Sequence, residues 1–323
     1  MIHYPDKGDM RAVRPHIRAS EMMTRNRMSE SGRLPPYAGV FWSECFSKTA
    51  CIPRFPDEGA RQEDYRIFFD DVAKLYDELS NWFMATIGTT AIDARHDATF
   101  GLALYILQLL VFALKSTAGQ TVAGRLIART ALEAYLTLSF LSSKDDPTIW
   151  MQYRNYGAGQ SKLAYLKNVS VEDLPSFTTR ELLESLANED MWMEFQDINL
   201  GAWSDKNLRK MAEEAGVKDV YDRYYDGLSA YVHANWSATR HAVYGDCVNP
   251  LHRFHRVPVP PRFLFQDTVP DIVKIANLAL ERVAILYPPF KPRLHLKVQT
   301  KHRRKRERPK SERVDYSSPG PTE

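Results

Sequence analysis

Apolar side chains recur at three- and four-residue steps over most of residues 59–290, which predicts a succession of α-helices. The clearest amphipathic run extends from Tyr65 to Phe83 and ends near Gly88. Two later runs, 97–115 and 121–141, are apolar nearly all round, so these helices should be buried. No sustained alternation of a sheet and no internal repeat interrupts this pattern. It predicts an all-α fold, a single bundle of about 7–8 helices.

Capping signals indicate where the later helices begin. Asp146 followed by Pro147 joins an N-cap residue to proline at the first helical position, and Thr178 with Glu181 matches a capping box. A short helix is predicted to begin at a Ser204 cap and end at Gly216, and a helical stretch over 220–244 is interrupted at Gly227. A proline-rich loop over 249–263 then leads to a last helix from Thr268 to Tyr287.

Composition divides the chain into three parts. Residues 1–58 are rich in Arg, Met, Ser and Pro, and we predict an irregular, partly disordered extension. Residues 59–290 form the helical domain. Residues 291–323 are predicted to be a disordered basic tail, because 297–313 alone holds nine Lys and Arg against two Glu, while the whole chain carries only +3.

The basic tail suggests a partner. A dense run of cations without interleaved aromatic residues favours salt-sensitive attraction to RNA or DNA, with Arg303, Arg304, Lys305 and Arg306 as the expected phosphate contacts. The same four residues resemble a nuclear import signal, should the host be eukaryotic. A tail that only keeps the protein soluble is the alternative.

Signals for secretion or membrane insertion are missing. The N-terminus has no apolar signal-peptide core, and the most hydrophobic run, 100–114, is shorter than the roughly 20 residues that span a bilayer. Three cysteines, Cys45, Cys51 and Cys247, are too few and too scattered for a disulfide framework, which indicates a reducing compartment. We therefore expect a cytoplasmic protein without a membrane partner.

Candidate chemistry begins with Arg129 and Glu133, two charges in the middle of an apolar helical stripe. A buried charge must be paired, because an unpaired ion in the interior costs several kcal/mol. The pair could be a structural ion pair, or Arg129 could bind a phosphate or carboxylate while Glu133 orients it. Arg before Glu is the weaker order for a local pair, which favours partners on other helices such as Tyr153, Arg154 and His233.

A second set of polar residues lies between 222 and 240. If this stretch is one helix, its polar side chains form a column: Asp222, Asp226, Ser229, His233, Ser237 and Arg240. The column could be a solvated face. In the functional alternative, His233 acts as acid or base and Arg240 stabilises charge on an oxyanion or phosphate.

Metal and nucleotide motifs are absent, so we predict no cofactor and no metal. Cys45 and Cys51 are separated by five residues, and His3 and His16 are remote, so we do not expect a zinc site there. His252 and His255 are better candidates for a metal or phosphate contact, although a basic surface loop explains them as well.

Three segments in this order resemble an uncharacterised bacterial family of helical proteins, over roughly 60–245: RTALEAYLTLSFL (129–141), YRNYGAG (153–159) and YYDGLSAYVHAN (224–235). The resemblance implies one buried or cleft-lining cluster of Arg129, Glu133, Arg154, Ser229 and His233.

That arrangement is similar in style to HEPN-type helical ribonucleases of bacterial toxin and antiviral defence systems. Those enzymes cut RNA without metal, using an Arg followed, after four to six intervening residues, by a His on the same helix. Here only Arg11 and His16 have this spacing, in the N-terminal extension, and Arg240 follows His233 instead of preceding it. A ribonuclease would need an arginine from another helix, such as Arg129, or from the second subunit of a homodimer.

Two functions therefore stand side by side. The first is a binding or effector module in which the Arg/Glu/His cluster is structural. The alternative is a metal-independent HEPN-like ribonuclease, with His233, Arg129 and Glu133 as catalytic residues and Arg154, Ser229 and Arg240 in support.

Overall fold

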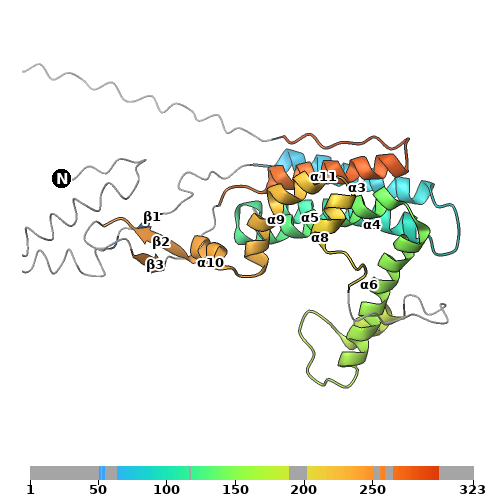
Figure 1. Cartoon of the computed structure of the whole chain (residues 1–323), viewed down its shortest axis with the longest axis horizontal. Coiled ribbons are helices and arrows are strands. Elements are labelled where there is room, and N and C mark those ends of the chain that lie inside the picture. Colours follow the sequence, from blue (N-terminus) through green and yellow to red (C-terminus); the bar gives the residue numbers. More distant parts are fainter. Residues whose placement is uncertain are drawn as a thin grey trace, which may run out of the picture.

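The fold is all-α, as predicted, with nine α-helices and three short strands in the part of the chain described (Figure 1). The structure is a computed structural model that describes residues 51, 53–54, 64–115, 118–188, 202–249, 255–258 and 265–297. Residues 1–50 and 298–323, which include most of the predicted extension and of the basic tail, lie outside the described residues.

The elements keep the labels of Figure 1. The helices are α3 (Arg66–Ala85), α4 (Ala94–Lys115), the 3-10 turn η3 (Ala118–Gln120), α5 (Val122–Lys144), α6 (Pro147–Asn168), α7 (Arg180–Ala187), α8 (Leu208–Glu214), α9 (Lys218–Val232), α10 (Trp236–Val243) and α11 (Val269–Leu286). The strands are β1 (Pro53–Arg54), β2 (Tyr244–Cys247) and β3 (Arg256–Pro258).

The core lies between α3, α4, α5 and α11, with α8 and α9 packed on α5. Helix α5 is its centre, since 14 of its 23 residues are buried. Helix α4 is long and apolar enough to cross a membrane by length and composition, but half of its most apolar window is buried inside the protein. It packs against α3, α5, α6 and α11, which is the packing of a core helix.

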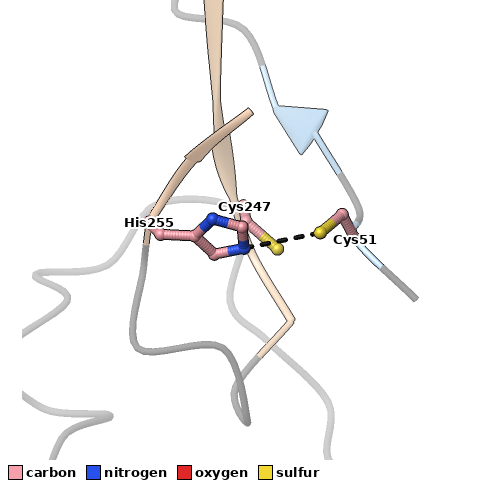
Figure 2. Close-up of side chains that lie close together, drawn as sticks. All are labelled: Cys51, Cys247 and His255. Atoms are coloured by element: carbon pink, nitrogen blue, oxygen red, sulfur yellow. Dashed lines mark hydrogen bonds between the residues drawn. The ribbon is translucent and has the colours of Figure 1, made fainter. Parts of the chain in front are cut away.

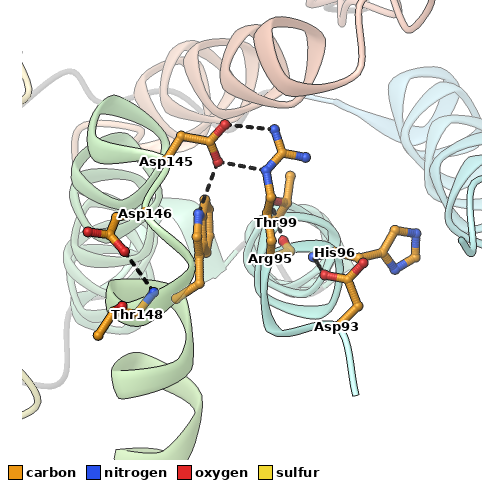
Figure 3. A network of polar contacts seen from close by, with 8 residues as sticks. Asp93, Arg95, His96, Thr99, Asp145, Asp146 and Thr148 are labelled. Carbon is orange, nitrogen blue, oxygen red and sulfur yellow. Dashed lines mark hydrogen bonds and ion pairs between the residues drawn. The ribbon is translucent and has the colours of Figure 1, made fainter. Parts of the chain in front are cut away.

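Polar contacts fix the corner where α4, α5 and α6 meet (Figure 3). Asp145 ends α5 in the left-handed region, at φ 43°. Its carboxylate accepts hydrogen bonds of 2.6 and 2.9 Å from Arg95 and one of 3.1 Å from the Trp150 indole. The hydrogen bond from Arg95 lowers the pKa of Asp145. Asp146 then caps α6 through the backbone N–H of Thr148, at 2.8 Å, which confirms the predicted start.

Two predicted caps were off by one to three residues. Thr179, and not Thr178, caps α7 by accepting a hydrogen bond from Leu182. Asn207, and not Ser204, caps α8 by accepting one from Lys210. Both true caps have extended backbone angles, which an N-cap requires. Where several capping residues stand close together, tertiary packing decides which one takes this conformation.

The helical stretch 220–244 breaks at a different place from the one predicted. Helix α9 continues through Gly227, and the break falls after His233, where Ala234 adopts a φ of +48°. The backbone N–H of Asn235 donates to the carbonyl of Ala230 at 2.9 Å, the six-to-one hydrogen bond of a Schellman cap. The prediction at Gly227 was therefore wrong, and the stretch forms two helices instead of one, which raises the number above the predicted 7–8.

A small antiparallel sheet was not predicted. Strand β2 pairs with β1 on one side (Pro53 opposite Cys247) and with β3 on the other (Gly245 opposite Val257). With two, four and three residues, these strands are too short to show alternation in the sequence. The sheet lies beyond α10, away from the helical core (Figure 1).

The chain after α11 runs back along the helical body as far as Lys297 (Figure 1). Phe290 and Leu294 are buried in the core. The Asn277 side chain holds Leu294 from both sides, accepting from its N–H at 2.8 Å and donating to its carbonyl at 3.0 Å. Residues 291–297, which composition assigns to the tail, are thus anchored on α11.

Candidate functional site

Arg129 and Glu133 form an ion pair within α5. The Arg129 Nη1 lies 2.7 Å from the Glu133 Oε2, although Arg before Glu is the weaker order for such a pair. Arg129 is only 6% exposed, whereas the Glu133 side chain is 53% exposed. The pair therefore joins a buried guanidinium to a carboxylate at the surface.

The other residues expected from the sequence have contacts or surroundings of their own. Arg154 lies 3.6 Å from Asp97, and Arg240 pairs with Asp246 at 3.0 Å. Ser229 is buried in α9. His233 is exposed at the end of α9. The structure thus pairs Arg129 with Glu133, while Arg154 and Arg240 each approach a different carboxylate.

The distance between Arg129 and His233 follows from the contact of Arg129 with α9. The Arg129 guanidinium lies 4.4 Å from the ring centroid of Tyr225. His233 comes eight residues later, which is about 12 Å along a helix axis. Joint action of this pair on one phosphate would need the two side chains to bridge that axial separation.

Instead, two arginines of α5 stack on tyrosines of α9. We call Arg125, Arg129, Tyr225 and Tyr231 the arginine–tyrosine ladder. Arg129 lies over Tyr225, and one turn earlier Arg125 lies 5.7 Å from the ring centroid of Tyr231. Each such contact contributes about 0.5–2 kcal/mol, with the larger value for desolvated groups. The ladder therefore fixes the register between the two helices.

Arg125 is buried almost as deeply as Arg129. It is 8% exposed, its Nη1 donates to the Thr121 carbonyl at 3.2 Å, and its guanidinium lies 4.8 Å from the centroid of Phe265. Burial lowers the pKa of Arg125, while Tyr231 and Asp267 act in the opposite direction. Phe265 comes from the segment before α11, so three distant parts of the chain enclose this cation.

His241 belongs to the same enclosure. Its Nδ1 is hydrogen-bonded to the hydroxyl of Tyr231, and its ring meets Phe265 edge-on at 4.9 Å. Burial and the charge of Arg125 lower the pKa of His241, which leaves the imidazole neutral at pH 7. A neutral imidazole can act as a general base, and a guanidinium beside it, which stays protonated, can stabilise negative charge. Sequence patterns did not indicate this pair, because Arg125 and His241 are far apart in the chain and the helix break at Ala234 sets the direction of α10.

Three potential metal ligands meet at the sheet (Figure 2). Cys51 precedes β1, Cys247 ends β2 and His255 precedes β3. The Cys51 Sγ lies 3.4 Å from the His255 Nε2, and all three ligand atoms lie within 4.8 Å of one another. The sequence had suggested His255 as a metal or phosphate contact, but with His252, which like Cys45 lies outside the described residues.

Basic side chains form a row along the anchored segment 290–297. Lys291, Arg293, His295 and Lys297 are exposed, and they alternate with residues that are buried or half-buried: Phe290, Pro292, Leu294 and Leu296. We call these four exposed residues the basic row.

The basic row borders an open groove of about 590 Å³ between this segment and α3. The α3 side contributes Lys74 along with two carboxylates, Asp71 and Glu78. Lys297 pairs with Asp71 at 2.8 Å, and Arg293 pairs with Glu281 of α11. These contacts hold the row against the helices without neutralising all of it.

Comparison with known families adds one finding. Residues 108–247 match a family of unknown function, DUF5677. No curated protein and no solved structure matches the chain.

The DUF5677 match covers 140 of the 323 residues, less than half of the chain. It fits the resemblance to an uncharacterised helical family. The arginine–tyrosine ladder, His241 and Cys247 lie within the match, whereas Cys51, His255 and the basic row lie outside it. The family carries no activity to transfer.

Proposed function

We propose that this chain is a helical binding module that holds RNA or DNA along residues 291–313. The observation that carries the proposal is the basic row, anchored on the helical body and continuous in sequence with the most basic part of the chain. Beyond Lys297 follow Arg303, Arg304, Lys305 and Arg306, the phosphate contacts expected from the sequence.

The geometry of the row suits a polyanion. Alternate side chains of an extended chain are about 6.7 Å apart on one side, a repeat similar to that of phosphates along an extended single strand. Because Phe290 and Leu294 are buried, the row is already ordered, so binding loses less conformational freedom than with a free tail. Lys and Arg supply most of the affinity in such contacts through release of counterions.

The helical body serves as the scaffold in this proposal. Arg129 has its pairing within α5 and its stacking on Tyr225, and both contacts stabilise helix packing. This favours the structural role for the pair, the first of the two functions considered from the sequence.

The test is the affinity of the full chain for a labelled single-stranded RNA and a labelled DNA duplex, measured by fluorescence anisotropy over a range of salt concentrations. We expect binding that weakens steeply with salt. A chain ending at Lys297 and a triple variant, Lys291→Ser with Arg293→Ser and Lys297→Ser, should each weaken binding at least about tenfold at low salt. Each should also reduce the salt slope by roughly 0.7–0.9 for every phosphate that the protein no longer neutralises.

A matched control removes charge elsewhere. Lys167→Ser with Lys210→Ser changes exposed lysines of α6 and α8 and should leave affinity unchanged. Absence of binding at low salt, or equal weakening in the control and the triple variant, would refute the proposal.

The ribonuclease remains a second candidate, and the enclosure of Arg125 with His241 is the observation that favours it. In this candidate the general base is His241 and not His233, the residue expected from the sequence. Purified protein should then degrade RNA in the presence of a chelator, and His241→Gln should abolish cleavage while His233→Gln does not. Intact RNA, or equal cleavage by both variants, removes this candidate. Light scattering on the same preparation tests the predicted homodimer.

A further inference from the structure

We infer that Cys51, Cys247 and His255 bind one zinc ion, which links the segment before β1 to the β2–β3 hairpin. The site is separate from the basic row and independent of the proposed binding function. Its three ligands come from parts of the chain as far as 204 residues apart.

The spacing of the ligand atoms agrees with tetrahedral zinc. With Zn–S of about 2.3 Å and Zn–N of about 2.0 Å, a tetrahedral angle places sulfur and nitrogen about 3.5 Å apart and two sulfurs about 3.8 Å apart. The Cys51 Sγ and the His255 Nε2 are 3.4 Å apart, and no pair among the three ligand atoms exceeds 4.8 Å. One ion can therefore reach all three with small side-chain movements.

The donor set selects the metal. Two thiol sulfurs and one imidazole nitrogen suit zinc, whereas calcium and magnesium prefer oxygen. Zinc binds the thiolate form of cysteine, so metal loading of this site would release the thiol protons. The described residues thus supply three of the four ligands of a tetrahedral site.

The fold around the ligands explains what the ion contributes. Strands of two, four and three residues form few ladder hydrogen bonds, and such small sheets are marginal in water. The hairpin is extended by the hydrogen bond from the Cys247 N–H to the His255 carbonyl, at 2.9 Å, which aligns two of the ligands. A bound ion would cross-link all three strands, as metals do in other small units with little apolar core.

The test uses the full chain purified under reducing conditions. We expect about one zinc ion per chain by mass spectrometric metal analysis. After zinc is removed with a chelator, added cobalt(II) should give a thiolate-to-cobalt charge-transfer band and visible bands of tetrahedral geometry. Chelation should also speed proteolysis near Cys51 and in β3, while the circular dichroism of the helices stays unchanged.

Variants of the two more accessible ligands carry the test, because Cys247 is fully buried and its replacement could disturb folding. Cys51→Ser and His255→Ala should each lower zinc affinity by more than about tenfold, since removal of even an outer-shell partner costs 10–100-fold. His295→Ala, an exposed histidine outside the group, is the matched control and should bind zinc normally.

Three outcomes would overturn the site: zinc far below one ion per chain after growth in zinc-supplemented medium, native zinc affinity in the Cys51→Ser/His255→Ala double variant, or a Cys51–Cys247 disulfide in the reduced preparation. The anisotropy measurement separates this inference from the proposed function. Cys51→Ser should bind RNA like the native chain whether or not zinc is present.

Discussion

The helical body and the small sheet are held together by different forces. In the body, α4, α5 and α11 contribute long series of fully buried apolar side chains, and each is worth about 1.5–3 kcal/mol when buried. In β2, the residues that face inward are Gly245 and Cys247. The sheet therefore buries little apolar area, and the inferred zinc ion would add a cross-link to its backbone pairing.

The polar contacts of the two regions differ in the same way. In the body, Arg125 and Arg129 are buried and stack on tyrosines. At the sheet, Arg240 and Arg256 approach the half-exposed Asp246, where solvent screens the attraction. The two buried arginines of the body should therefore stabilise the fold more than the two exposed arginines at the sheet do. The variants below measure this difference.

The largest effect should come from the centre of the body. Leu132 of α5 is fully buried, and Leu132→Ala should lower the free energy of unfolding by about 2–5 kcal/mol, because it removes apolar contacts and leaves a cavity. Urea unfolding followed by circular dichroism measures it. The control is Leu166→Ala at an exposed position of α6, with a change within about 0.5 kcal/mol. Similar destabilisation in both variants would mean that α5 is not the core.

Gly124→Ala tests the close approach at the start of α5. A Cβ there would lie 2.5 Å from the Gly119 carbonyl, 2.6 Å from that of Ala118 and 2.7 Å from the Thr268 hydroxyl. Two of these atoms are backbone, so the helix must shift, and we expect the free energy of unfolding to fall by about 1–3 kcal/mol.

Gly101→Ala is the matched control for this position. It lies in α4 with open space around the added methyl group and should stabilise by up to about 1 kcal/mol through helix propensity. A neutral Gly124→Ala, measured by the same unfolding curves, would contradict the described contact between α5 and η3.

Removing one rung of the ladder should have an intermediate effect. Arg129→Ala removes the stacking on Tyr225 and the buried packing of the side chain, and should lower the free energy of unfolding by about 1–2 kcal/mol. His233→Ala, at the exposed end of α9, should stay within about 0.5 kcal/mol. Equal destabilisation by both variants would support the single Arg/Glu/His cluster that the sequence predicts.

The pH dependence of stability tests the contact between α10 and the body. The pKa of His241 is lowered on folding from an ordinary 6.5, so the unfolded chain binds this proton more tightly. The stability associated with the neutral His241 is therefore fully present above pH 6.5. It is lost as the pH falls through the lower pKa of His241 in the folded state.

Melting temperatures between pH 8 and pH 5 measure this dependence. His241→Gln should flatten the curve relative to that of the native chain. Identical pH profiles for the His241 variant and the native chain would show that the imidazole is not enclosed by Arg125 and Tyr231.

The smallest effect should come from the sheet's surface charges. Asp246→Asn weakens the contacts with Arg240 and Arg256 and should change stability by less than about 1 kcal/mol, because exposed ion pairs are worth little. Removing zinc should disturb the sheet more than this substitution does. The measurement is the rate of proteolysis near Cys51. Faster proteolysis after Asp246→Asn than after zinc removal would mean that ion pairs rather than metal ligands hold the strands.

Local sequence patterns were sufficient to predict the helical body. Periodicity located α3, α4, α5 and α11, and the Asp146–Pro147 signal located the start of α6, because these features depend on neighbours three or four residues away. The same local rule brought Arg129 next to Glu133. Burial of α5 followed from its apolar composition alone.

The sites, by contrast, depend on how distant segments pack. The break at Ala234, the enclosure of Arg125 with His241 and the meeting of Cys51, Cys247 and His255 join residues that local patterns cannot connect. Strands of two to four residues carry no readable period, and the alternation of the basic row mattered only once Leu294 was seen to dock on α11. Periodicity shows which face of a helix is apolar, but the partner of that face is chosen only when the helices pack together.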